Sequence, residues 1–74
     1  MQIDPTPLSD CLILTPRRHS DARGWFMETW NAARMARAGL DTVFVQDNQS
    51  QSIARGTLRG LHFQAPPRAQ HKLV

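Results

Sequence analysis

Three side chains in the last third of the chain have the types and spacing that proton transfer on an anionic substrate requires. Arg59 and His62 lie in the run G-T-L-R-G-L-H-F-Q, residues 56–64, and Lys72 follows after a Pro66-Pro67 corner. A guanidinium binds phosphate through paired hydrogen bonds. A histidine pKa near neutrality suits a general base, and an ammonium group stabilises a developing oxyanion. These residues predict chemistry on an anionic substrate with an acidic carbon.

Each of the three also has a purely structural interpretation. A lone histidine on a strand is more often a structural residue than a base, and Arg59 is as well explained by structure as by a ligand. Lys72 also fits an edge strand, where a lysine discourages aggregation. No carboxylate lies near His62 in sequence. An aspartate that orients its imidazole must therefore come from another strand or from residues after position 74.

Alternation along the predicted strand 56–64 gives a geometric test. Successive side chains of a strand point to opposite faces, which places Arg59 and His62 on different faces. If both serve one ligand, the register must slip between them, and Gly60 is where a bulge or tight bend costs least. We therefore predict an irregularity at Gly60.

The rest of the chain predicts a mainly β fold with one short helix. The expected elements are an extended arm over residues 1–10, strands over 11–15, 25–30 and 42–48, turns over 21–24 and at 55–56, and a helix over 32–38. Asn31 is the expected N-cap and Gly39 the expected C-terminal glycine, with Arg34 and Arg37 on a solvated face. The aromatic residues of 25–30 favour a core or an interface over ligand stacking.

Length and composition limit the possibilities further. The chain has 74 residues and one cysteine, Cys11, so it holds one domain at most and no internal disulfide. We expect Cys11 to be buried and inert. Residues 72–74 read as the opening of another strand, so residues 1–74 are interpreted as a single incomplete domain, the N-terminal piece of a longer polypeptide. Without a signal peptide or a membrane-spanning run, a cytoplasmic location is expected.

The formal charge of +3 raises the possibility of nucleic-acid binding, but the charge pattern disfavours it. The arginines are interleaved with carboxylates rather than gathered in one tract, which suits a small phosphorylated ligand better than a duplex. A metal site is also disfavoured, because the second ligand position of a histidine pair on one strand face, two residues after His62, is occupied by Gln64.

Several runs together resemble a known family. D-A-R-G-W-F-M-E, F-V-Q-D-N-Q-S-Q-S, G-T-L-R-G-L-H-F-Q, P-P and Q-H-K-L-V occur in this order and at close to this spacing in the N-terminal portion of the dTDP-4-dehydrorhamnose 3,5-epimerase family. The resemblance covers nearly all of the chain from Cys11 onward. It implies a cupin-type double-stranded jelly roll, a homodimer, and epimerisation at C3 and C5 of a dTDP-4-keto-6-deoxyhexose in dTDP-L-rhamnose biosynthesis, without a metal or organic cofactor.

The resemblance also implies roles for particular residues. His62 resembles the base that removes the proton, and Lys72 the lysine near the C4 oxygen. The remaining residues resemble substrate contacts: Arg59 to the diphosphate, Arg23 and Glu28 to the nucleotide from the neighbouring subunit, Gln46, Asp47 and Asn48 lining the nucleotide end, and Phe26 packing near the base. We expect no role for His71.

Departures from the family pattern leave alternative functions open. The family's tyrosine acid and the aspartate that pairs with the histidine lie beyond position 74, and this chain contains no tyrosine. We therefore expect residues 1–74 alone to be inactive. A related dTDP-4-keto-sugar 3- or 5-epimerase and a non-catalytic sugar-nucleotide binding fragment remain as alternatives.

Overall fold

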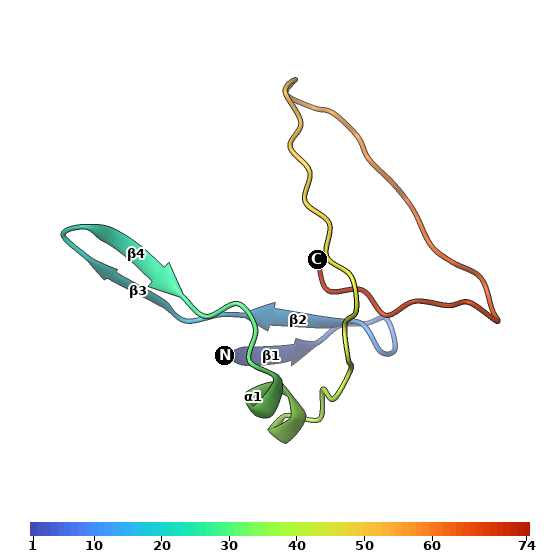
Figure 1. Ribbon diagram of the computed structural model, residues 1–74, viewed down its shortest axis with the longest axis horizontal. Helices are drawn as coiled ribbons and strands as arrows, with labels where there is room; N and C mark the ends of the chain where they lie inside the picture. The colour runs from blue at the N-terminus through green and yellow to red at the C-terminus, as the bar shows by residue number, and fades with distance from the viewer. The chain divides into compact units, whose positions relative to one another are not determined.

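The computed structural model describes residues 1–74 and divides into two compact units, Met1–Asp41 and Thr42–Val74. All regular secondary structure lies in the first unit. It comprises four strands in two antiparallel pairs and one short helix (Figure 1). The predicted mainly β class with one short helix is thus confirmed. No part of the chain forms a helix with the length and apolar character needed to cross a membrane.

The first hairpin pairs β1 (Gln2–Pro5) with β2 (Leu12–Thr15), with Ile3 opposite Leu14. The predicted strand over 11–15 is confirmed. The arm over 1–10 is extended in β1, as predicted, but the expectation that it has little internal structure is wrong, because β1 pairs with β2. Pro5 stands at the end of β1, where a missing N–H costs little, so the residues before it remain free to pair. The Thr6 hydroxyl closes the connection by donating to the Cys11 carbonyl oxygen at 2.8 Å.

The second hairpin pairs β3 (Arg18–Asp21) with β4 (Gly24–Met27) through a two-residue connection. The predicted turn over 21–24 is confirmed. Gly24 has φ +134°, a conformation that L side chains rarely adopt, and the glycine therefore permits the tight connection. The second strand ends at Met27 rather than at Trp30, because the residues after it lead into the helix.

Helix α1 (Ala32–Arg37) has both of its predicted ends. The Asn31 side chain accepts a hydrogen bond from the Arg34 N–H at 3.1 Å, as an N-cap does. At the other end Gly39 has φ +87° and donates to the Ala36 carbonyl, while the Leu40 N–H donates to the Met35 carbonyl at 2.8 Å. These two bonds form a Schellman motif, which satisfies carbonyls that a helix end leaves free.

The second unit, Thr42–Val74, contains turns but no strand. The predicted strands over 42–48 and 56–64 are therefore wrong for this structure. A strand needs a neighbour to satisfy its backbone groups, and no segment pairs with either run. Turns do form where predicted, closed by bonds from the Thr57 N–H to Ala54 and from the Arg68 N–H to Ala65.

The backbone irregularity expected at Gly60 is present, but it does not interrupt a strand. Gly60 has φ +126°, so the backbone there takes a conformation that favours glycine, although the flanking residues do not form a strand.

Burial is limited to one side chain. Met35, on α1, is 2% exposed and is the only buried residue. Trp25 and Phe26 are 60% and 73% exposed, so the prediction that these aromatics lie in a core is wrong for this chain, while an interface stays a prediction. Cys11 is exposed, contrary to the expected buried thiol, because the β1–β2 connection that carries it is covered by no other element.

Candidate functional site

The predicted site residues fall into two groups on the two units. Arg23, Phe26 and Glu28 lie on or beside the β3–β4 hairpin, and the others lie in residues 42–74. Arg23 and Phe26, but not Glu28, line an open surface hollow of about 480 Å³. Its lining consists of His19, Ser20, Asp21, Arg23, Gly24, Trp25 and Phe26.

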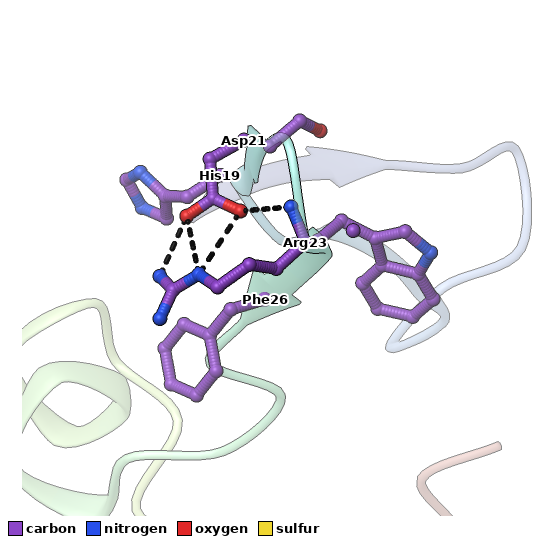
Figure 2. Close-up of a pocket in the computed structure, with 7 residues that line it drawn as sticks. His19, Asp21, Arg23 and Phe26 are labelled. Carbon is purple, nitrogen blue, oxygen red and sulfur yellow. Dashed lines mark hydrogen bonds and ion pairs between the residues drawn. The ribbon is translucent and has the colours of Figure 1, made fainter.

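Arg23 is held by Asp21 at the tip of this hairpin (Figure 2). The Asp21 Oδ1 accepts the backbone N–H of Arg23 at 2.9 Å, while Oδ2 accepts from Nη2 at 2.6 Å and from Nε at 3.2 Å. The guanidinium side-chain bond, followed by the backbone bond, lowers the pKa of Asp21 from its ordinary value of 3.8. The carboxylate in turn raises the pKa of Arg23.

Cations and aromatic rings share this hairpin. The guanidinium of Arg18 lies 5.7 Å from the centre of the Trp25 ring, a cation–π distance. Phe26 pairs across the hairpin with His19. Because adjacent strand residues alternate, Trp25 and Phe26 place one flat ring on each face of the hairpin. Positive charge and flat rings are features that bind a phosphorylated heterocycle.

Glu28 is fixed at the entry to α1. Its Oε2 accepts from the Asn31 Nδ2 at 3.3 Å, and its Oε1 accepts from the Arg34 Nη1 at the same distance. Both oxygens of the carboxylate are therefore engaged by the first turn of the helix. Arg34 is 66% exposed, as predicted, but its pairing with Glu28 was not predicted.

In the second unit the structure brings Lys72 to His62. The Lys72 ammonium donates to the His62 carbonyl oxygen at 2.9 Å, across the Pro66-Pro67 corner. The positive charge thus lies against the backbone of the predicted base, while the imidazole is exposed and makes no hydrogen bond of its own. The contact brings the Lys72 ammonium to the backbone of residue 62, and a base and a cation are the groups that proton abstraction next to a carbonyl requires.

The remaining predicted residues are less well assembled. The Arg59 Nη2 donates to the Gln51 carbonyl oxygen at 3.0 Å, and no contact joins it to His62. Gln46 and Asn48 lie on one side of the backbone, as alternation predicts, with the Gln46 Nε2 3.4 Å from the Asn48 Oδ1. Asp47 makes no hydrogen bond or ion pair.

Sequence reasoning also missed contacts of two residues that had no predicted role in the site, Asp21 and Thr42. The position of Asp21 two residues before an arginine at a turn is typical of an Asx turn and was a usable signal. The Thr42 contact is the bond between its hydroxyl and the His71 Nδ1 at 3.2 Å. These two residues are far apart in sequence, and no local pattern predicts such a pair.

Comparison with known proteins identifies the family. Residues 5–74 match the family model described as dTDP-4-dehydrorhamnose 3,5-epimerase. The chain therefore belongs to the dTDP-4-dehydrorhamnose 3,5-epimerase family. No solved structure matches it significantly.

Individual relatives agree with this assignment. The chain is 51% identical over 69 residues to a dTDP-4-dehydrorhamnose 3,5-epimerase of Methanothermobacter thermautotrophicus, an alignment that covers 93% of this chain and 36% of that protein. It is 47% identical over 75 aligned positions to one of Shigella flexneri, covering 100% of this chain and 41% of that protein. A dTDP-4-dehydrorhamnose 3-epimerase of Streptomyces niveus is 35% identical, covering 100% of this chain and 36% of that protein. The chain spans about two fifths of the length of these relatives.

Proposed function

We propose that this chain carries the base and much of the nucleotide-binding surface of a sugar-nucleotide 3,5-epimerase. The substrate is dTDP-4-dehydro-6-deoxy-D-glucose and the product dTDP-4-dehydro-L-rhamnose, in dTDP-L-rhamnose biosynthesis. The names of the relatives support the activity. The contact between Lys72 and the His62 backbone is the structural observation that carries the proposal.

In the proposed mechanism the His62 imidazole removes the proton from the carbon beside the C4 ketone. The electron pair of the broken C–H bond moves toward the ketone, and negative charge grows on the C4 oxygen. The Lys72 ammonium stabilises that charge, which lowers the barrier to enolate formation. Return of a proton to the opposite face of the carbon completes one inversion, and repetition at the second carbon completes the reaction.

The substrate is held by the other predicted residues. Arg59 binds the diphosphate, and Gln46, Asp47 and Asn48 line the nucleotide end. Arg23, Phe26 and Glu28 are contributed by the hairpin of the neighbouring subunit in a homodimer. In this mechanism no metal or organic cofactor takes part, because a general base and a cation at the enolate oxygen supply the required chemistry.

We further propose that residues 1–74 are one incomplete domain of a cupin-type double-stranded jelly roll, active in the cytoplasm as part of a complete epimerase. Two observations support this. The chain spans about two fifths of its relatives, and only Met35 is buried. The acid that reprotonates the substrate belongs to the portion that the relatives have in addition, so residues 1–74 alone do not turn over substrate.

A chimera tests the proposal. Residues 5–74 replace the matching segment of the Shigella flexneri relative, and deuterium incorporation from D2O is followed at C3 and C5 of the sugar by NMR. Exchange at both carbons supports 3,5-epimerisation. The second candidate, a 3-epimerase, which the similarity to the Streptomyces niveus protein raises, requires the same measurement on a complete protein that carries residues 1–74, where exchange at C3 alone favours it. Binding of dTDP without exchange at either carbon refutes the catalytic proposal and leaves a binding module.

A further inference from the structure

We infer that Asp21 is a positioning residue that holds one edge of the Arg23 guanidinium and thereby aims its other edge at a phosphate of the bound nucleotide. The inference rests on the proposed function and adds to it a residue that has no assigned role. Both residues lie at the tip of the β3–β4 hairpin, beside the open hollow (Figure 2).

The atoms involved define which edge remains for a ligand. A guanidinium has five N–H donors arranged so that two edges each bind an oxyanion bidentately. Asp21 occupies the edge formed by Nε and Nη2, with Oδ2 at 3.2 Å and 2.6 Å from these nitrogens. Nη1 makes no hydrogen bond, and its edge with Nη2 is therefore open to a phosphate.

The same carboxylate also fixes the backbone under the guanidinium. Oδ1 accepts the Arg23 N–H at 2.9 Å, which forms an Asx turn over the connection between β3 and β4. Main chain and side chain of one residue are thus anchored by one carboxylate. This matters because the Arg23 side chain is 90% exposed and has no packing to orient it.

Two effects of removing the carboxylate oppose each other. An oriented side chain loses less freedom on binding, which is worth about 2- to 10-fold in affinity. The carboxylate also repels a phosphate, and at a separation of about 6 Å in water this costs at most about threefold before screening by salt of about 0.15 M. Screening at this salt concentration brings the repulsion to about twofold or less, so orientation is the larger effect over most of its range and loss of Asp21 weakens binding.

The test introduces Asp21→Asn and Asp21→Ala into the chimera described above, which supplies the rest of the domain and the neighbouring subunit, and compares each with the parent chimera at about 0.15 M salt. Asparagine keeps the acceptor for the Arg23 N–H and loses the ion pair, whereas alanine loses both. Dissociation constants for dTDP are measured by NMR titration, and hydrogen exchange of the Arg23 Nε–H reports on the ion pair. Asp10→Asn is the matched control, because it removes the same charge elsewhere and asparagine tolerates the φ of +61° found at that position.

We expect a slowly exchanging Nε–H in the parent chimera and in Asp10→Asn that is lost in both Asp21 variants. We also expect the net of the two effects to weaken dTDP binding up to about fivefold in Asp21→Asn, and further in Asp21→Ala. Equal dTDP affinity in the parent and both Asp21 variants overturns the inference and leaves the proposed function intact. A parent chimera that binds no dTDP refutes the proposed nucleotide binding, and the role of Asp21 falls with it.

Discussion

Replacing Asn31 by alanine should open helix α1 and release Glu28 at the same time. The side chain accepts the Arg34 N–H at 3.1 Å and donates to Glu28 at 3.3 Å. Loss of an N-cap acceptor costs about 1 kcal/mol, within a range of about 0.5–2 kcal/mol. The exposed bond to Glu28 adds only a few tenths, because water replaces it readily. The total of about 1 kcal/mol corresponds to a roughly fivefold larger opening equilibrium.

Amide hydrogen exchange of Met35 measures this opening, because its N–H donates to the Asn31 backbone carbonyl at 2.9 Å, a bond that the substitution keeps. Asn31→Asp separates the two effects. Aspartate keeps the cap acceptor and adds a favourable negative charge at the helix N-terminus, but it cannot donate to Glu28. We expect wild-type protection of the Met35 amide in this variant together with a changed carboxyl chemical shift for Glu28. Unchanged Met35 exchange in Asn31→Ala refutes the role of the cap, as does Asn31→Asp exchange as fast as that of the alanine variant.

Three further predictions concern the helix end, the hairpin and the lysine. Gly39→Ala should destabilise the end of α1 by about 1–2 kcal/mol, because φ is +87° at this position, although the added Cβ meets no atom. The Leu40 amide should therefore exchange faster, and unchanged exchange contradicts this. The Asp21 carboxyl should titrate below 3.8, and its pKa should move back toward that value in Arg23→Ala. The ion pair therefore stabilises the hairpin above pH 3.8, and this stability is lost as pH falls through the lowered pKa. A midpoint at 3.8 in both the wild type and Arg23→Ala contradicts this. Lys72→Met should lower kcat of the chimera about 10²- to 10³-fold with little change in KM, whereas a loss confined to KM contradicts a role at the enolate.

The parts of the fold that follow local rules were predictable from sequence. Gly24 and Gly39 adopt positive φ where a tight connection and a helix end require it, and Asn31 caps α1. These features depend on residues within a few positions of one another. The helix therefore begins where expected and ends one residue earlier than the predicted range.

The failures concern pairing between segments. Alternation over residues 42–48 and 56–64 predicts a strand only if another strand lies beside it, and sequence periodicity does not say which segment that is. For residues 1–10 the error was a missed strand pairing. The two prolines were given more weight than the short stretch that pairs with β2.

The contacts of the candidate site likewise comprise one that the sequence led us to expect and others that it does not specify. The Pro66-Pro67 corner led us to expect Lys72 close to His62, and the structure does bring the two together. The anchoring of Arg59 on Gln51 and the bond between Thr42 and His71 come from segments distant in sequence, which residue types and spacing do not specify.

The proposed epimerisation depends most on the role of His62 as the base. Its most direct test is the initial rate of deuterium incorporation at C3 and C5 in the chimera, compared between His62→Gln and the matched variant His71→Gln. We predict a loss of about 10²- to 10⁴-fold at both carbons for His62→Gln, the range that general base catalysis contributes, and a rate within about threefold of the parent for His71→Gln. Incorporation at the parent rate in a folded, dTDP-binding His62→Gln chimera would contradict the assignment.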